Sequence, residues 1–345
     1  MRTVWLGLSI TSSWGNGHAT NYRGLLAALA QRGHEVLFLE RDMPWYAANR
    51  DFSAPFVRLY GSVDELERWT EDVRDADIVV VGSYVPDGCD VAEWALATAR
   101  GVTAFWDIDT PVTAAKLARG DHEYLSPALV PRFDLYLSFT GGPFLETLGA
   151  RRPTPFHCIA DPRLYRPLDV PLRFELGYLG TYSDDRQPKV DELLLEPARS
   201  LPASRFAVAG PQYPDDIDWP GNVDRFDSLP PAEHPAFYAA QRLTLNVTRA
   251  DMVAAGWSPS VRLFEAAACG VPVVSDWWDG LDAFFEPGLE ILVAEDADDV
   301  FRHLREADRA VGLRARERVL AEHTAAHRAA ELERHVARVR EEVHA

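Results

Sequence analysis

Short apolar segments alternate with segments of helical periodicity along most of the chain, in two successive series. In the first series, apolar runs at 3–10, 77–82 and 102–106 are each followed by a helical pattern. Nearly continuous apolar runs of this length are typical of parallel strands that helices cover on both faces. The alternation therefore predicts an α/β fold with a doubly wound parallel sheet. The second series, which begins at residue 174, predicts another such sheet.

A proline-rich segment separates the two series. It carries no helical pattern and predicts an interdomain linker at about 160–173. We therefore predict an N-terminal domain at 1–165 and a C-terminal domain at 166–323. In the last helix, at about 324–345, apolar residues recur every three or four positions and need a surface to cover them. We expect that helix to cross back to the N-terminal domain.

The segment 258–276 predicts a helix that leads into a buried strand. Ser258 suits the N-cap, a proline suits the first helical position, and Gly270 stops the helix. The free N–H groups at the start of such a helix attract anions, and Arg262 adds a cation that suits phosphate. Glu265 projects from the same face. The two side chains form either a nucleotide site or an ordinary ion pair on a solvated helix, and the apolar character of the other positions favours the first interpretation.

The charge balance limits the partners. Lys and Arg number 35 against 53 Asp and Glu, which gives a formal net charge of −18, and no cluster of basic residues offsets it. Nucleic acids and anionic membranes are therefore not expected partners. The three cysteines lack metal-ligand spacing, no apolar run reaches membrane-spanning length, and no signal peptide precedes the first strand. These features predict a cytoplasmic protein without a membrane span.

The whole chain resembles the glycosyltransferases of the GT-B fold, in which two Rossmann-like domains face a cleft. Three stretches carry this resemblance: the glycine-containing first loop with RGHEVLFLE, the interdomain segment IADPRLYRP, and the helix and strand RLFEAAACGVPVVSD. Within that fold the chain is similar to the CgeB-like family, through LGYLGTYSDDR and LNVTRADM. The resemblance implies a bacterial enzyme of the hexosyltransferase class that transfers a sugar from a UDP- or dTDP-linked donor, with no cofactor and no metal.

The same resemblance implies the donor site. Glu265 would bind the ribose hydroxyls, and Arg262 would bind the diphosphate. The remaining donor residues come from the first loop, from the ends of two strands and from the start of the helix: Gly17, Gly180, Thr181, Arg186, Asn246, Arg249, Ser258 and Ser260. Retaining members of the fold carry a second glutamate where this chain has Trp257, so the complete glutamate pair is absent from the sequence.

The N-terminal domain supplies the candidates for acceptor chemistry. His18, in the first loop, is either the catalytic base, because a histidine can accept a proton near neutral pH, or a residue that caps the next helix or hydrogen-bonds its own loop. Asp109 either caps the next helix or lines the cleft as a base or acceptor ligand. With Asp107 it forms an Asp-x-Asp, a metal motif of another glycosyltransferase fold. Aromatic residues near strand ends could stack on a sugar or an aromatic acceptor, or belong to the core: Trp14, Tyr84 and Trp106, together with Trp45 and Tyr46.

Two other functions remain open from the sequence. A nucleotide-sugar 2-epimerase of the same fold would need further acid–base carboxylates in the cleft. A catalytically silent surface or spore-assembly protein would keep the nucleotide fold without turnover. For the transferase we expect two partners, a small nucleotide sugar and an acceptor that is a small molecule, a glycan or a protein.

Overall fold

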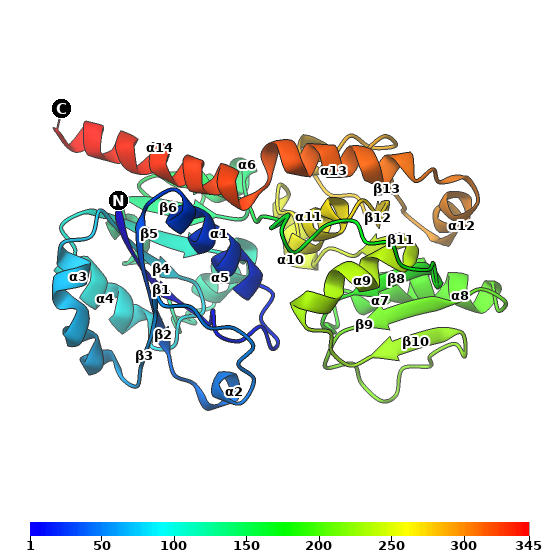
Figure 1. Cartoon of the computed structure of the whole chain (residues 1–345), viewed down its shortest axis with the longest axis horizontal. Coiled ribbons are helices and arrows are strands. Elements are labelled where there is room, and N and C mark those ends of the chain that lie inside the picture. Colours follow the sequence, from blue (N-terminus) through cyan, green and yellow to red (C-terminus); the bar gives the residue numbers. More distant parts are fainter. Residues whose placement is uncertain (345) are drawn as a thin grey trace. The chain divides into compact units, whose positions relative to one another are not determined.

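The first seven strands form one parallel sheet in the computed structural model, which describes residues 1–344 (Figure 1). The chain adds β2 and β3 on one side of β1 and then returns to add the other four strands on the opposite side. The strand order therefore reverses between β1 and β4. Across the sheet the strands are β3 (Val57–Tyr60), β2 (Glu35–Arg41), β1 (Arg2–Gly7), β4 (Ile78–Gly82), β5 (Val102–Asp107), β6 (Leu135–Ser138) and β7 (Pro153–Pro155).

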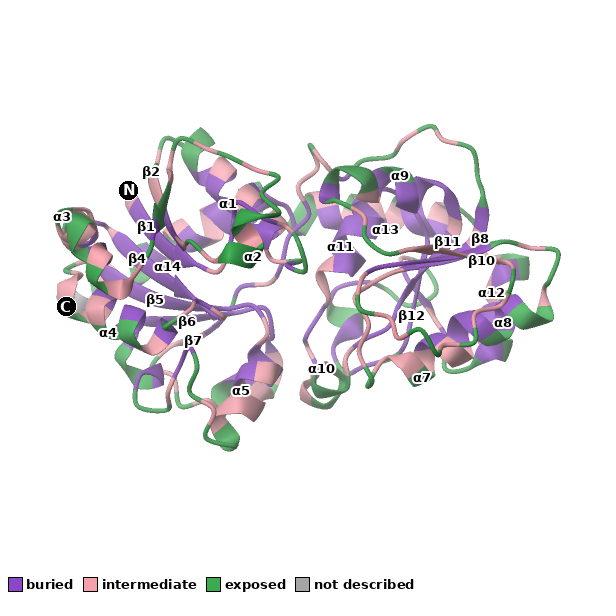
Figure 2. Cartoon of the chain, turned by 90° about the horizontal axis from the view of Figure 1, so that it is seen from below, coloured by how far each residue is buried: buried purple, intermediate pink, exposed green. Residues whose placement is uncertain are grey.

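Helices cover both faces of this sheet. Alternate residues of β1 point to opposite faces, as a pleated strand requires. Val4 and Leu6 join the apolar cluster that includes α4, whereas Trp5 packs against Trp106 on the other face with ring centroids 5.6 Å apart. The strands near the centre of the sheet are buried along their length (Figure 2). The helices are α1 (Ala19–Gln31), α2 (Pro44–Ala47), α3 (Thr70–Arg74), α4 (Gly88–Thr98), α5 (Thr110–Ala118), α6 (Gly142–Glu146) and α14 (Ala325–His344), with 3-10 turns at Val63–Trp69 and Val130–Arg132.

The last helix, α14, belongs to the same unit as this sheet. It packs against α1 and reaches β5, and its side chains Leu332 and Val336 are buried. Arg32 of the α1–β2 turn pairs with Glu333 at 2.6 Å. The predicted return of the C-terminal helix to the N-terminal domain is therefore confirmed.

The chain divides into two units. The first comprises Met1–Cys158 together with the segment from Ala325 onward, and the second comprises Ile159–Thr324. The chain thus passes from the first unit to the second after Cys158, whereas the sequence analysis predicted that the N-terminal domain would end at residue 165.

The second unit is built around a six-stranded parallel sheet. Its strand order reverses between β8 and β11, in the same way as the first sheet reverses between β1 and β4. Across the sheet the strands are β10 (Val223–Phe226), β9 (Phe206–Ala209), β8 (Phe174–Leu179), β11 (Gln241–Asn246), β12 (Val273–Ser275) and β13 (Leu292–Val293). The helices are α7 (Gln187–Val190), α8 (Glu196–Ser200), α9 (His234–Ala239), α10 (Ala250–Ala255), α11 (Val261–Ala268), α12 (Ala297–Glu306) and α13 (Ala310–Glu322), with a π-helical turn at Asp191–Leu195 and 3-10 turns at Pro231–Glu233 and Leu281–Ala283.

Three predicted helices differ from the observed ones. α11 begins after Ser260 rather than after Ser258, because Ser260 is the last residue with extended backbone before the helix. The helical pattern that follows the run 102–106 predicts a helix over 111–131, but the observed helix ends at Ala118, shortly before Gly120 takes a positive φ of +77°. The amphipathic pattern from Leu313 to the C-terminus predicts one long helix, but it belongs to two helices, α13 and α14, interrupted near Thr324, which forms an isolated β-bridge with Ala160.

No helix in residues 1–344 combines the length and the apolar character that crossing a membrane requires.

The packing of α14 generates a stability prediction. Leu332→Ala should lower the free energy of unfolding by about 2–4 kcal/mol, since Leu332 is fully buried and its removal leaves a cavity. Arg338→Ala, an exposed position on the same helix, should change it by less than about 0.5 kcal/mol. Urea unfolding of the full-length variants measures both effects. Equal stability of the two variants would mean that the inner face of α14 does not stabilise the first unit.

Candidate functional site

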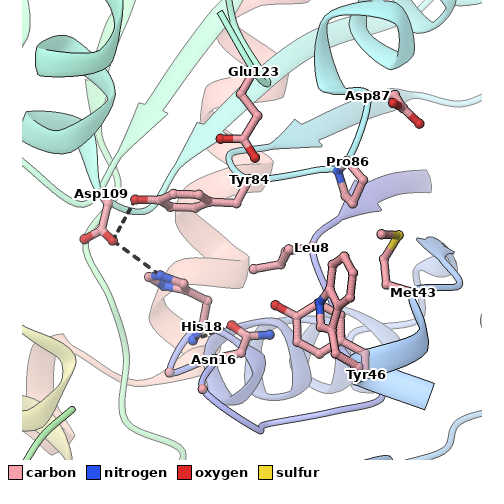
Figure 3. Close-up of a pocket in the computed structure, with 13 residues that line it drawn as sticks. Leu8, Asn16, His18, Met43, Tyr46, Tyr84, Pro86, Asp87, Asp109 and Glu123 are labelled. Carbon is pink, nitrogen blue, oxygen red and sulfur yellow. Dashed lines mark hydrogen bonds and ion pairs between the residues drawn. The ribbon is translucent and has the colours of Figure 1, made fainter. Parts of the chain in front are cut away.

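A pocket of about 630 Å³ opens in the first unit, at the carboxyl ends of its strands (Figure 3). Its walls come from the loops after β1, β4 and β5 and from α2, on both sides of the point where the strand order reverses. Open parallel sheets bind ligands at such points. The lining residues are Leu8, Gly15, Asn16, Gly17, His18, Met43, Trp45, Tyr46, Tyr84, Pro86, Asp87, Asp109 and Glu123.

A buried carboxylate fixes the start of the loop after β1. Glu40 of β2 is fully buried, and its Oε2 accepts hydrogen bonds from the backbone N–H groups of Ile10 at 2.8 Å and Thr11 at 3.0 Å. Its Oε1 accepts from the hydroxyls of Ser9 at 2.9 Å and Thr11 at 2.6 Å. The backbone at the root of the loop is therefore satisfied although it is buried. The sequence identified Glu40 only as the end of a strand.

The loop places His18 beside Asp109. Asn16 connects the two ends of the loop, since its Nδ2 donates to Ser9 O at 2.8 Å and its Oδ1 accepts from the backbone N–H of His18 at 3.1 Å. His18 Nε2 then lies 3.7 Å from Asp109 Oδ2. These two residues, predicted separately as catalytic candidates, come together at one end of the pocket (Figure 3).

Tyr84 completes this arrangement. Its hydroxyl donates to Asp109 Oδ2 at 3.1 Å, and its ring stacks on His18 with centroids 6.2 Å apart. Burial and the charge of Asp109 raise the pKa of Tyr84 far above its ordinary value, so the hydroxyl stays protonated and donates. Tyr84 also has a φ of +64°, which is uncommon for a residue with a side chain. Asp109 holds the N-cap position of α5, but within the described chain it makes no side-chain capping bond to that helix.

The two carboxylates of the Asp-x-Asp have different surroundings. Asp107 is fully buried and accepts hydrogen bonds from Tyr136 at 2.5 Å and Thr113 at 2.9 Å, whereas Asp109 lines the pocket. Burial raises the pKa of Asp107 to about 6, although these hydrogen bonds oppose the shift. The motif therefore does not present two carboxylates to one ion. Among residues 1–344, no group of three or more His, Cys, Asp or Glu side chains is arranged to hold a metal.

The aromatic acceptor candidates divide into three cases. Tyr84 lines the pocket, as do Trp45 and Tyr46. Trp14 is 50% exposed but is not part of the pocket lining. The prediction for Trp106 is wrong, because this side chain is 2% exposed and packs against Tyr22 in the core, with ring centroids 4.8 Å apart. A strand that is covered on both faces buries its last aromatic residue even at the carboxyl end.

The second unit has its own polar cluster, also at the point where the strand order reverses. Arg262, near the start of α11, is 8% exposed and donates from Nη1 to Asn246 Oδ1 of β11 at 2.8 Å. Its Nε donates to the carbonyl of Leu179 at the end of β8. Ser260, at the N-cap of α11, donates to the same Asn246 oxygen at 2.7 Å. One helix and two strand ends are thereby joined around a single guanidinium.

Two further arginines surround Arg262. Arg186 donates to Thr181 O at 2.5 Å and to Ser183 Oγ at 3.1 Å, and Arg249 lies at the N-cap of α10. Burial lowers the pKa of Arg186, and the charges of Arg262 and Arg249 lower it further. Within residues 1–344, none of the three guanidinium groups has a carboxylate oxygen within 4.0 Å. We call Arg186, Arg249 and Arg262 the arginine cluster; its positive charge has no direct ion-pair partner in the described chain.

Tyr178 and Gly180 shape the space next to the cluster. The ring of Tyr178 lies under Arg262 at 4.8 Å, a cation–π distance. Its hydroxyl is buried and has no hydrogen-bond partner in the described part of the chain. A Cβ at position 180 would lie 2.8 Å from Arg262 Nη2 and 2.6 Å from the Tyr178 hydroxyl, so only glycine fits. The sequence predicted Gly180 but missed Tyr178, which looks like any other apolar strand residue.

Glu265 lies one turn further along α11. It is 4% exposed, lies 3.8 Å from His234 Nδ1, and hydrogen-bonds Tyr165. The alternative interpretation, an ion pair on a solvated helix face, is wrong because Arg262 and Glu265 are both buried. Of the other predicted donor residues, Ser258 is buried beside the helix, and Gly17 lines the pocket of the first unit.

The comparisons with known proteins agree with this architecture. Residues 186–334 match a family model described as glycosyl transferase-like. No curated protein matches the chain in sequence.

Solved structures match the chain over nearly its whole length. Sucrose-phosphate synthase of Thermosynechococcus elongatus is 15% identical with a TM-score of 0.67, over 97% of this chain and 98% of that one. HepE of Anabaena, solved with UDP and glucose, is 13% identical with a TM-score of 0.71, over 98% and 99%. An α-glucosyltransferase solved with UDP and a 13-mer DNA is 14% identical with a TM-score of 0.68, over 97% and 99%. The fold is that of the GT-B glycosyltransferases, as predicted.

The buried carboxyl of Asp107 generates a prediction about pH. Because its pKa is raised from 3.8 to about 6, the folded protein binds this proton at a higher pH than the unfolded chain does. The free energy of unfolding should therefore gain about 1 kcal/mol from this group between pH 7 and pH 5. Asp107→Asn should remove that gain, which urea unfolding at the two pH values measures. The same pH dependence in both proteins would contradict the shifted pKa.

Proposed function

We propose that this protein is a glycosyltransferase that moves a sugar from a UDP- or dTDP-linked donor to an acceptor hydroxyl, without a metal ion. The observation that carries the proposal is the arginine cluster. A diphosphate leaving group carries concentrated negative charge, and guanidinium groups without carboxylate partners are suited to stabilise it. The family match of residues 186–334, which span all three arginines, supports the same assignment.

The donor would lie across the start of α11. Free N–H groups and the positive end of the helix dipole favour a phosphate there. Arg262 and Arg249 would lie on either side of that phosphate. Glu265 would bind the ribose hydroxyls from one turn deeper, where its contacts with His234 and Tyr165 fix the carboxylate. UDP is bound in two of the similar structures named above, which favours UDP over dTDP.

The acceptor would bind in the pocket of the first unit. His18 would take the proton of the attacking hydroxyl, and Asp109 would hold the imidazole in orientation and stabilise the positive charge that forms on it. Tyr84 would in turn hold Asp109 through its hydroxyl. A base in this position suits direct displacement, which fits a chain that has Trp257 in place of the second glutamate of retaining members.

Donor binding is tested by removing one guanidinium. Arg262→Ala should weaken binding of UDP by about 1.5–3 kcal/mol, or about 10- to 150-fold, the usual value of a charge-assisted hydrogen bond. The control is Arg242→Ala. Arg242 is a half-exposed arginine at the amino end of β11, where it pairs with Glu175 of β8, so its removal should leave the affinity for UDP unchanged. Isothermal titration calorimetry measures both. Wild-type affinity in Arg262→Ala would exclude the arginine cluster as the diphosphate site.

Turnover is tested with a panel of UDP-, dTDP- and GDP-sugars followed by mass spectrometry. The wild type should hydrolyse one donor slowly, and EDTA should not change the rate because arginines replace the metal. His18→Asn should lower transfer to an acceptor by about 10²- to 10⁴-fold, the usual value of a general base, while UDP affinity stays the same.

The other outcomes of this panel identify the alternatives. Formation of an isomeric nucleotide sugar would indicate the 2-epimerase, and binding without any turnover would indicate the silent assembly protein. Activity that EDTA removes and manganese restores would overturn the metal-free mechanism.

A further inference from the structure

The pocket of the first unit has two chemically different ends. His18, Asp109 and the Tyr84 hydroxyl gather at one end, whereas Met43, Tyr46 and Pro86 lie toward the other (Figure 3). Trp45, next to Tyr46 on α2, is 48% exposed although it is a large apolar side chain, and the two rings lie 6.2 Å apart. An aromatic pair on a pocket wall, of which Trp45 is exposed and Tyr46 partly buried, is suited to covering a ligand ring.

The charged side chains that line the pocket include three carboxylates, and two of these carboxylates pair with cations outside the lining. Of its carboxylates, Asp87 pairs with Arg41 at 3.1 Å and Glu123 pairs with Lys116 at 2.5 Å. No Lys or Arg belongs to the described lining of the pocket. The carboxylate of Asp109 would therefore repel an anionic ligand, and no Lys or Arg in the lining would offset the negative charge of that ligand.

We propose that this pocket binds an uncharged aromatic hydroxy compound as the acceptor. This inference rests on the proposed function. The ring system would lie against Met43, Trp45 and Tyr46, and the hydroxyl would point to His18. A volume of about 630 Å³ suits a small molecule of two or three rings, since ligand pockets span roughly 300–1,000 Å³. Methionine supplies an adaptable apolar surface for rings of different shape.

A sugar fits this wall less well than an aromatic ring. A carbohydrate presents a hydroxyl on nearly every carbon, and each buried hydroxyl needs a hydrogen-bond partner. Apart from Asp87, which is already ion-paired, the side-chain polar groups on the far wall are the Tyr46 hydroxyl and the Trp45 indole N–H, so most hydroxyls of a sugar there would lack partners. An aromatic ring has only the one hydroxyl, at the reacting position.

The reaction is balanced with these two substrates. The acceptor oxygen forms a bond to C1 of the donor sugar while the bond from C1 to the diphosphate oxygen breaks. The electron pair of that bond leaves on the diphosphate, where the arginine cluster stabilises it. The proton of the acceptor hydroxyl passes to the imidazole of His18.

The first test is binding without a donor, by saturation-transfer NMR and calorimetry, and so it does not depend on turnover. The probes are 2-naphthol, 6-hydroxy-2-naphthoate, which adds one carboxylate to the same ring and hydroxyl, and cellobiose as a neutral sugar. We expect 2-naphthol to bind at least about tenfold more tightly than either of the others. Equal affinity for the naphthoate, or tighter binding of cellobiose, would overturn the proposal.

Variants locate the binding. Tyr46→Ala should weaken 2-naphthol binding about tenfold and Tyr46→Phe should restore most of it, because the ring rather than the hydroxyl makes the contact. Trp277→Ala removes an exposed tryptophan, 42% exposed, from the other unit and should have no effect. Unchanged binding in Tyr46→Ala, or an equal loss in Trp277→Ala, would place the naphthol elsewhere and overturn the proposal.

A final readout separates this inference from the proposed function. Once a nucleotide sugar that this protein hydrolyses is known, 2-naphthol is added to that reaction, and mass spectrometry should detect a naphthyl glycoside. Binding of 2-naphthol without that product would overturn the assignment of the pocket as an acceptor site. If no nucleotide sugar is bound or turned over, the proposed function fails, whereas the preference of the pocket for uncharged aromatic compounds stands on the binding data.

Discussion

All strands of both sheets run parallel, and this single constraint positions both polar clusters. Parallel strands bring all their carboxyl ends to one edge of the sheet. Where the strand order reverses, the two adjacent connections run in opposite directions, and such points usually have a crevice between the connections. In the first unit that crevice contains His18, Tyr84 and Asp109, which follow three different strands. In the second unit Arg186, Arg249 and Arg262 lie beside the reversal point between β8 and β11. Residues far apart in the sequence meet because of the direction of the strands, before any specific contact holds them.

A buried carboxylate then stabilises one loop beside each reversal point. In the first unit Glu40 accepts four hydrogen bonds from the loop after β1. In the second, Asp276 follows β12 and accepts from the backbone N–H of Thr248 at 3.1 Å and from its hydroxyl at 2.9 Å. Each carboxylate lies on or just after a neighbouring strand and satisfies buried loop backbone or hydroxyl groups that would otherwise lack partners. The same physical solution thus occurs twice, in loops of different sequence.

The sequence predicted the fold well because the fold depends on periodicity. Apolar runs, glycine stops and the proline-rich segment mark strands, helix ends and the passage between units, and the apolar stripe of α14 showed that this helix needed a surface. The polar cluster of the second unit was also largely predictable as a cluster, since Arg262, Asn246 and Gly180 lie at strand and helix ends whose direction the fold already determines. What could not be predicted depends on tertiary burial. Trp106 looked like a ligand-stacking residue until its contact with Tyr22 placed it in the core.

The first site shows the same limit. Met43 and Pro86 have no chemical signature in the sequence, and they become pocket residues only because their loops meet. In the sequence, Glu40 is only the last residue of the stretch RGHEVLFLE, and the structure alone reveals the loop that it anchors. The start of α11 was predicted two residues too early, because Ser258 and Ser260 are equally good caps in sequence and only backbone conformation distinguishes them.

The arginine cluster also has a consequence for how this protein can evolve. Three like charges near one another, one of them buried over a tyrosine ring and beside a glycine, work against the folded state when no anion is present. A substitution such as Arg186→Met is therefore expected to make the unliganded chain more stable while reducing the affinity of the site. Selection for stability alone would therefore be expected to replace these arginines, whereas selection for anion binding would keep them. In the proposed function, the diphosphate of the donor would offset this charge repulsion, so that donor binding would stabilise the second unit.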